Sequence, residues 1–192
     1  MRLLTGSLFV FIVAALVGLG ATWLSLTGDL RFGALTIGSW TAYPRIGTPD
    51  ADPYARASIV RTGLLPIGLG DGVSFIARHD DAGRPLDGRC TIAVSGMTPA
   101  ARFWTLTLYN AGGGLVANSL GRYGFTSQEV LRHADGRFTI AIAPRASAGN
   151  WLPTGGVERY QLALRLYDTP VGVATRAGNE TPMPQIVTTE CP

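Results

Sequence analysis

The sequence predicts a mainly β protein: an antiparallel β-sandwich or jelly-roll-like domain with one short helix, preceded by a single N-terminal transmembrane helix. Segments with alternating apolar side chains recur roughly every ten to twenty residues, mostly without helices between them. The 25 glycines and 12 prolines follow no fixed period, which suits short strands joined by tight turns. A long apolar segment opens the chain, which predicts the membrane helix.

The apolar segment covers residues 3–28 and meets no charged residue before Asp29. It is longer than the roughly 20 residues that a helix needs to cross a bilayer. Arg2 on the short side predicts a cytoplasmic N-terminus, and Trp23 lies where an interfacial ring is favourable. We therefore expect residues 1–28 to be a membrane anchor with the main domain on the far side of that membrane, which in a Gram-negative bacterium is the inner membrane with the domain in the periplasm.

A cleaved signal peptide is the alternative interpretation of the same segment. Gly18-Leu19-Gly20 offers the small residues of a cleavage site. The apolar run continues past this point through Trp23 and Leu26 and exceeds the roughly 7–15 residues of a signal core. The sequence favours the uncleaved anchor.

Beyond the anchor, we expect an extended linker or arm over residues 29–52 and a β domain over residues 53–192. Asp52 before Pro53 is a helix-start signal and Gly63 a stop signal, so the short helix is predicted between them. Period-two alternation then predicts strands within VSFIARH (73–79), RCTIAVS (89–95), RFWTLTLY (102–109), RFTIAIAP (137–144) and RYQLALRLY (159–167).

The two cysteines, Cys90 and Cys191, fit an oxidising compartment. A bond between them would close a loop of about 100 residues and stabilise the fold by about 4–5 kcal/mol in the chain-entropy model. Cys90 alternates with Ile92 and Val94, which also suits a buried free thiol. We expect the disulfide. We expect no metal site, because the cysteines and the two histidines show no ligand spacing.

Several ordered motifs carry a family resemblance: ARFWTLTLYN, GRYGF, HADGRFTIAIAP, GNWLPTGG and YQLALRLYDTP. Together they resemble the DUF1214 domain, a bacterial domain of unknown function, and the anchored layout resembles its compact alphaproteobacterial-type members. The resemblance covers roughly residues 38–192. It implies a β-sandwich-like fold, no settled activity and, as a partner, a companion domain of the DUF1254 type. Asn110 stands where Asp is common, and residues 154–156 replace a usual Ala-Pro.

The sequence shows no established catalytic pattern. A G-x-S-x-G nucleophile elbow is absent. Asp80, Asp81, Asp135 and Glu158 could in principle supply paired carboxylates, but the aspartates are more simply turn formers. The net charge is +3 with both signs scattered, which argues against the basic stripe of a nucleic-acid-binding protein. We expect no nucleic-acid partner and no cofactor, and the sequence favours a non-catalytic module over an enzyme.

One strand and the turn before it hold the most informative polar and aromatic side chains. Arg165 and Tyr167 lie on the face opposite the leucines, and a buried Arg165 would need an acidic or carbonyl partner such as Asp135 or Asp168. Two interpretations stay open: a structural network beneath the Trp151 turn, or a pocket in which arginine binds a carboxylate or sugar and aromatic rings stack. The candidate ligand-binding residues are Arg122, Tyr123, Asp135, Trp151, Arg165 and Tyr167.

These observations predict a membrane-anchored, periplasm-facing envelope protein. Its β domain is expected to be a non-catalytic binding or accessory module for a protein partner or for an envelope component such as a glycan or lipid. The alternative is an enzyme that acts on an envelope carbohydrate through a pocket of arginine, tyrosine and aspartate.

Overall fold

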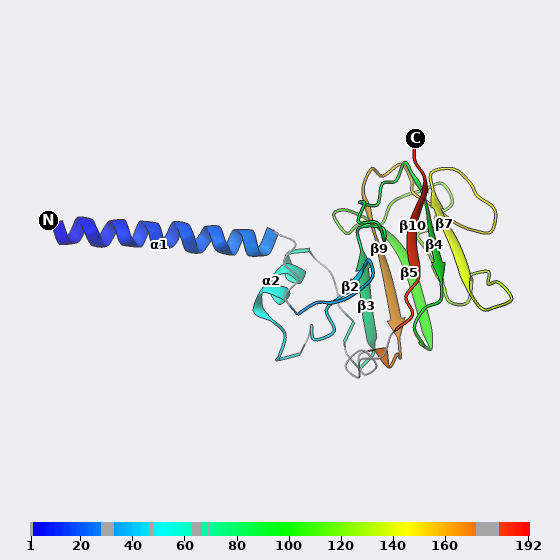
Figure 1. The fold of residues 1–192 in the computed structure, drawn as a ribbon, viewed down its shortest axis with the longest axis horizontal. Helices are drawn as coiled ribbons and strands as arrows, with labels where there is room; N and C mark the ends of the chain where they lie inside the picture. The colour runs from blue at the N-terminus through cyan, green and yellow to red at the C-terminus, as the bar shows by residue number, and fades with distance from the viewer. Residues whose placement is uncertain (1, 28–32, 47, 63–66, 69, 172–180) are drawn as a thin grey trace.

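The computed structural model describes residues 2–27, 33–46, 48–62, 67–68, 70–171 and 181–192 (Figure 1). The helices described in full are α1 (Arg2–Thr27) and α2 (Pro53–Thr62). The described strands are β1 (Leu35–Ile37), β2 (Trp40–Ala42), β3 (Gly72–Ala77), β4 (Thr91–Gly96), β5 (Phe103–Asn110), β6 (Gly124–Thr126), β7 (Phe138–Ala143), β8 (Asn150–Pro153), β9 (Tyr160–Tyr167) and β10 (Gln185–Glu190).

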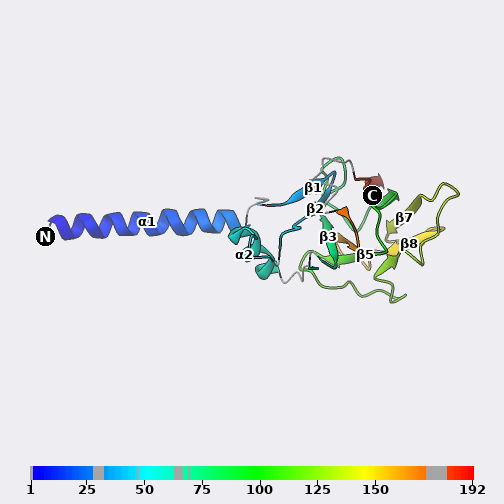
Figure 2. The same ribbon diagram turned by 90° about the horizontal axis from the view of Figure 1, so that it is seen from below.

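Helix α1 extends away from the β domain in both views (Figures 1 and 2). Its apolar stretch, Leu4–Ser25, is 22 residues long, and none of its most hydrophobic window is buried against the rest of the chain. An apolar helix of this length can cross a bilayer, because its backbone groups are all bonded within the helix. The structure therefore confirms a membrane-span candidate, and a signal sequence would have the same form.

Helix α2 begins where the sequence predicts it. The Asp52 carboxylate accepts hydrogen bonds from the backbone N–H groups of Tyr54 (2.9 Å) and Ala55 (3.0 Å). These bonds satisfy amide groups that have no partner inside the first turn of a helix. On its buried side, Ile59 packs with Ile46 and other apolar side chains in a small cluster outside the main core.

The β domain is a sandwich of two sheets, as predicted. A six-stranded sheet has the order β1-β2-β3-β9-β5-β6, and a four-stranded sheet has the order β10-β4-β7-β8. All neighbours are antiparallel except β7 and β8, which pair in parallel from Ile140 opposite Asn150 to Ala143 opposite Pro153. The four-stranded sheet is therefore mixed, because the chain returns after β7 and runs along it in the same direction.

The core lies between the two sheets and consists of the side chains that alternation predicts. Leu162, Leu164 and Leu166 of β9 are all at most 1% exposed. Trp104 of β5 and Phe138 of β7 pack with their ring centroids 5.2 Å apart, so this contact joins the two sheets. Burying these faces supplies the main favourable free energy of folding.

The segment predicted as a linker, residues 29–52, differs from expectation in its middle part. There β1 and β2 form a hairpin whose second strand pairs with β3, so the hairpin is the edge of the six-stranded sheet. Trp40 is 1% exposed, and its indole N–H donates a hydrogen bond of 2.7 Å to the Pro184 carbonyl oxygen. Strands of three residues are too short to show alternation, so the sequence predicted only an extended segment here.

The C-terminal strand is fixed covalently. β10 pairs with β4, and the Cys90–Cys191 disulfide follows directly, with the two Cα atoms 4.2 Å apart. The bond closes a sequence separation of 101 residues. The structure thus confirms the disulfide that the sequence predicts. The bond joins the residue after β10 to the residue before β4.

Candidate functional site

The candidate site lies on the outer face of the six-stranded sheet, which we define as its side facing away from the four-stranded sheet. β9 lies between β3 and β5 in this sheet. Its leucines enter the core, so Arg165 and Tyr167 occupy the outer face, as alternation predicts. Both side chains are half-buried. Removing a cation from water costs free energy unless other groups bind it, so the partners of Arg165 have to be identified.

Arg165 belongs to a row of polar side chains that crosses four neighbouring strands. In the register of the sheet it lies opposite Ser74 on β3 and Thr105 on β5, and Thr105 lies opposite Thr126 on β6. Residues paired across neighbouring strands share one face of a sheet, so these four side chains lie together on the outer face. We call Ser74, Arg165, Thr105 and Thr126 the Arg165 row.

The only hydrogen bond of the Arg165 side chain within the described residues is made to a tyrosine. Its Nη1 donates to the Tyr109 hydroxyl at 3.1 Å, and its guanidinium carbon lies 5.3 Å from the centroid of the Tyr109 ring. Ala163, between these residues on the same face, is fully buried. No acidic side chain in the described part of the chain forms an ion pair with Arg165.

The surroundings of Arg165 offer hydroxyl groups and aromatic rings. Within the described residues, the hydroxyls of Ser74 and Thr105 form no hydrogen bond, whereas the Thr126 hydroxyl bonds to the Glu129 carboxylate at 2.9 Å. Below the row, the rings of Phe103 and Tyr167 pack with centroids 5.9 Å apart. The outer face therefore combines one guanidinium, two hydroxyls without a hydrogen bond among the described residues, aromatic surface and, at its β6 edge, the Glu129 carboxylate.

Trp151 does not lie over Arg165. It belongs to β8, at the edge of the four-stranded sheet, and its indole N–H donates to the Ala143 carbonyl oxygen at 3.0 Å. Arg122 does join it: Arg122 Nη1 donates to the Trp151 carbonyl oxygen at 3.1 Å, and the Arg122 guanidinium lies over the Phe125 ring at 5.4 Å. Arg165 and Trp151 are on different sheets and have separate hydrogen-bond partners among the described residues.

The remaining candidate residues also lie away from Arg165 or serve the fold. Tyr123 is 38% exposed, and its backbone carbonyl oxygen accepts from the Leu108 N–H as part of the sheet edge. Asp135 closes an exposed turn with Arg137, by a hydrogen bond of 3.0 Å to the backbone N–H and an ion pair of 3.8 Å. The acidic partner expected for Arg165 is therefore not Asp135; Tyr109 takes that place.

Asp168, the other acidic partner considered for Arg165, sits in a strained turn directly after β9. Its φ angle is 50°, and its backbone N–H donates to the Asp71 carbonyl oxygen at 2.9 Å. The side chain is exposed and forms no ion pair with Arg165 among the described residues. Asp168 therefore ends the strand and does not pair with Arg165.

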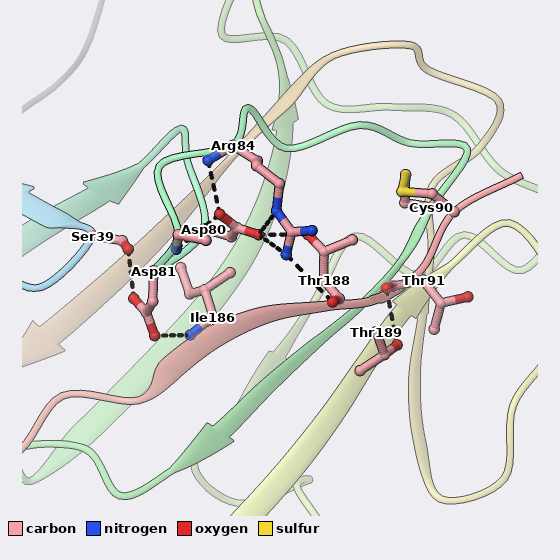
Figure 3. Close-up of polar contacts among 11 residues, drawn as sticks. Ser39, Asp80, Asp81, Arg84, Cys90, Thr91, Ile186, Thr188 and Thr189 are labelled. Carbon is pink, nitrogen blue, oxygen red and sulfur yellow. Dashed lines mark hydrogen bonds and ion pairs between the residues drawn. A yellow bond between two sulfur atoms is a disulfide. The ribbon is translucent and has the colours of Figure 1, made fainter.

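A second polar cluster lies in the loop after β3 and holds β10, the edge strand of the four-stranded sheet (Figure 3). Asp80 is 2% exposed, and its carboxylate accepts hydrogen bonds from Arg84 Nε (2.9 Å), the Thr188 hydroxyl (2.7 Å) and two backbone N–H groups. Asp81 accepts from the Ser39 hydroxyl and from the Ile186 N–H at 2.9 Å. We call these residues the Asp80 clamp, because they fasten the β1–β2 hairpin and β10 to one loop.

The negative charge of Asp80 is stabilised by other groups of the protein. Burial alone would raise the pKa of Asp80, but hydrogen bonds from Thr188 and Arg84 outweigh burial and lower the pKa to about 2. A groove of about 790 Å³ borders the clamp and is also lined by His79 and Trp40. The oxygens of both Asp80 and Asp81, which line the groove, are already bonded to other groups of the protein.

Metal binding finds no support in the described part of the chain. No group of three or more histidine, cysteine, aspartate or glutamate side chains lies close enough there to hold an ion. Both cysteines are joined in the disulfide, so neither offers a thiolate ligand.

The two departures from the family pattern have structural roles. The Asn110 side chain accepts a hydrogen bond of 2.9 Å from the Gly114 N–H and closes the turn after β5. Gly155 has a φ angle of 60°, and a Cβ atom there would lie 2.6 Å from the Ala117 carbonyl oxygen. Glycine at position 155 is therefore required by both the backbone angle and the close approach.

The fold and the site define a two-sheet β-sandwich domain behind an apolar N-terminal helix, with a cation-bearing outer sheet face. The chain belongs to the DUF1214 family, described as proteins of unknown function, whose family model matches residues 71–171. No curated protein matches the chain.

Solved structures resemble the fold. The VPA0106 protein from Vibrio parahaemolyticus matches with a TM-score of 0.58 and 22% identity, over 76% of this chain and 37% of that protein. An uncharacterised protein from Burkholderia cenocepacia matches with a TM-score of 0.45 and 17% identity, over 92% of this chain and 52% of that protein. The likeness to the Vibrio protein shows the fold alone, and this chain spans little more than a third of its length.

Sequence reasoning missed Tyr109, Thr105 and Ser74 as neighbours of Arg165. Alternation within residues 102–109 places Thr105 and Tyr109 on the strand face opposite Leu106 and Leu108. What it could not give was the pairing of β9 with both β3 and β5, which sets these residues beside Arg165. The sequence pattern therefore indicated which face of each strand these residues occupy, but it did not indicate which strands are neighbours.

Proposed function

We propose that this protein is a membrane-anchored, periplasm-facing binding module that holds an acidic glycan of the cell envelope on the Arg165 row. The observation that carries the proposal is that Arg165 is half-buried on the outer face with no acidic partner among the described residues. Its neighbours there are a tyrosine and two open hydroxyls.

The chemistry of the row fits a carboxylate on a sugar. A guanidinium presents its N–H groups in a fixed fork that matches the two oxygens of a carboxylate. Ser74 and Thr105, on either side of Arg165, can donate to or accept from sugar hydroxyls. The Phe103–Tyr167 pair offers aromatic surface on which a sugar ring can stack. Half-burial strengthens each charge-assisted bond, because the local dielectric is lower than in water.

The geometry favours binding over catalysis. Hydrolysis of a glycosidic bond requires two carboxyl groups that face each other across the substrate. The Arg165 row contains no carboxyl group, Asp135 closes an exposed turn, and Asp80 is held in its clamp. Next to the row, the Glu129 carboxylate is bonded to the hydroxyl and the backbone N–H of Thr126, so the enzyme alternative would need a second carboxyl group that faces it.

The proposed location rests on α1 and on the disulfide. Helix α1 would anchor the chain in the inner membrane, with Arg2 and the N-terminus in the cytoplasm. A disulfide persists in oxidising compartments such as the periplasm, so Cys90–Cys191 supports a periplasmic β domain. This arrangement would hold the outer face close to the inner membrane, where envelope glycans are assembled and passed outward.

Binding to oligosaccharides tests the proposal. The full chain, purified in mild detergent, is titrated calorimetrically with uronic-acid oligosaccharides and with the matching neutral oligosaccharides. We expect binding to the acidic set alone, and Arg165→Gln should weaken it by about tenfold or more, the effect of one lost charged hydrogen-bonding group. Arg137→Gln, in an exposed turn, is the matched control and should bind as the natural chain does.

Two outcomes would overturn the glycan proposal. One is equal binding of the acidic and neutral sugars, and the other is undiminished binding by Arg165→Gln.

Affinity purification from mild detergent tests the other expected partners, a protein of the envelope and a companion of the DUF1254 type. A protein captured by the natural chain and lost with Arg165→Gln would identify a protein as the ligand of this face instead.

A further inference from the structure

Helix α2 has two chemically different sides. Ala55 and Ile59 are buried, at 7% and 8% exposure, and pack toward the small cluster beside the β domain. On the other side, Tyr54 and Val60 are large apolar side chains with 45% and 76% exposure. A single exposed valine is ordinary on a protein surface, so the residues that surround Val60 decide what this side of the helix can contact.

The exposed side is an apolar stripe between two cations. Pro53, Ala57 and Val60 follow the spacing i, i+4, i+7, which places them on one face of a helix, and all three are exposed. Arg56 and Arg61 lie on either side of this stripe, because each successive residue turns by about 100° around a helix. An apolar stripe flanked by cations is the pattern of helices that lie in a membrane interface.

The position of α2 relative to α1 indicates which surface covers the stripe. The Arg61 guanidinium lies over the Trp23 ring of α1, 5.2 Å from its centroid. Trp23 stands two residues before the end of the apolar stretch Leu4–Ser25. In a spanning helix, a tryptophan at that point lies at the level of the lipid headgroups. Both views show α2 beside this end of α1, between α1 and the β domain (Figures 1 and 2).

The charges around α2 suit an anionic lipid surface. Arg45 and Arg56 are exposed together with Arg61. The nearest acidic side chains in the described sequence, Asp50 and Asp52, precede the helix, and Asp52 is engaged in capping it. Arginine side chains at a membrane surface are attracted to anionic headgroups.

We propose that α2 is an interfacial helix that docks on the bilayer spanned by α1. The stripe of Pro53, Ala57 and Val60 enters the boundary between headgroups and acyl chains, while Arg56 and Arg61 bind lipid phosphates. The helix is about 15 Å long, so its contact fixes the distance and tilt of the β domain above the membrane. This inference rests on the proposed membrane anchoring by α1 and adds a second, peripheral contact.

Fluorescence quenching in lipid nanodiscs tests the docking with the full chain. Single cysteines replace Val60, Ala15 in the middle of α1, and Ala146 in an exposed loop of the β domain, and each carries an environment-sensitive dye. The natural cysteines are already bonded and do not react. The nanodiscs contain phosphatidylglycerol and lipids brominated near the carbonyl groups or deep in the chains.

We expect the label at position 60 to be quenched by the shallow bromines, at a depth of about 5–10 Å into the boundary region. The label at 15 should be quenched by the deep bromines, and the label at 146 by neither. In the chain labelled at position 60, exchanging Arg56 and Arg61 for glutamate should lower the quenching of that label in anionic discs. Arg137→Glu is the matched control and should leave it unchanged.

The labels distinguish the failure of α2 docking from the failure of the anchor. If position 60 stays as aqueous as position 146 while position 15 is quenched, α1 spans the bilayer and the docking of α2 is wrong. If position 15 is unquenched as well, the anchoring itself is wrong. Quenching at 60 that ignores lipid charge and both arginines would overturn the assigned role of Arg56 and Arg61.

Discussion

The Asp80 clamp and the Arg165 row each contain a charged side chain that is at least partly shielded from water. They differ in which groups bind that charge. Asp80 is bonded by two side chains and two backbone N–H groups, and its pKa is lowered to about 2. Arg165 has one tyrosine hydroxyl and no carboxylate within the described residues. The comparison separates a charge that stabilises the fold from a charge that, in the proposed function, binds a ligand.

The largest effect should come from the covalent bond beside the clamp. Replacing Cys90 and Cys191 together by serine removes a crosslink across 101 residues. The chain-entropy model gives a loss of about 4–5 kcal/mol in the free energy of unfolding. Urea unfolding of the full chain in detergent measures it. A loss below about 1 kcal/mol would show that the noncovalent clamp holds β10 by itself.

The clamp alone should also matter for stability. Asp80→Asn keeps the shape of the side chain but leaves Arg84 and Thr188 without their charged acceptor. We expect a loss of about 2–3 kcal/mol, because a charged hydrogen-bonding group in a buried site is lost. Asp135→Asn, in an exposed turn, is the control and should change stability by about 0.5 kcal/mol or less. Equal effects of the two variants would contradict the clamp.

The pH dependence of unfolding follows from the same carboxylate. The folded-state pKa of Asp80, about 2, is below its ordinary value of 3.8, so folding favours the ionised form. This contribution is complete above pH 3.8 and is lost as the pH falls through about 2. Asp87, whose pKa hydrogen bonds from Arg89 also lower to about 2, contributes in the same window.

Thermal unfolding between about pH 5 and pH 2 measures this acid limb. A shift of nearly two pKa units in a buried group corresponds to about 2 kcal/mol for Asp80. The Asp80→Asn variant should therefore show a shallower loss of stability with acid, with the remainder due to Asp87. An acid limb of unchanged slope in that variant would mean that other carboxylates control the transition.

The difference between the two regions also explains what the sequence could predict. Alternation in single strands placed the leucines of β9 in the core and Arg165 on the outer face, and Asp52 before Pro53 located α2. The partner of Arg165 depends on which strands flank β9, and Tyr109 is 56 residues away in sequence. Pairing between such distant strands is set by the packing of the whole sandwich, which local patterns do not encode.

The clamp was hidden for a related reason. Asp80 and Asp81 have the sequence signature of turn formers, which they are, but their second role depends on Thr188 and Ile186, more than 100 residues later. The hairpin that supplies Ser39 is built from strands of three residues, too short for alternation to reveal. Local sequence therefore predicted the turn, while the contacts that make it a clamp required the folded chain.

The smallest effect on stability should come from the Arg165 row, and it sharpens the comparison most directly. Arg165→Gln breaks one hydrogen bond to a tyrosine and no ion pair within the described residues, so the free energy of unfolding should fall by about 1 kcal/mol or less. Tyr109→Phe removes the same bond and retains the cation over the ring, so its effect should be no larger. Urea unfolding of both variants, beside Asp80→Asn, gives the three values in one series. If Arg165→Gln lowered the free energy of unfolding as much as Asp80→Asn does, the Arg165 charge would also stabilise the fold. That result would contradict the proposal that the outer face binds a ligand.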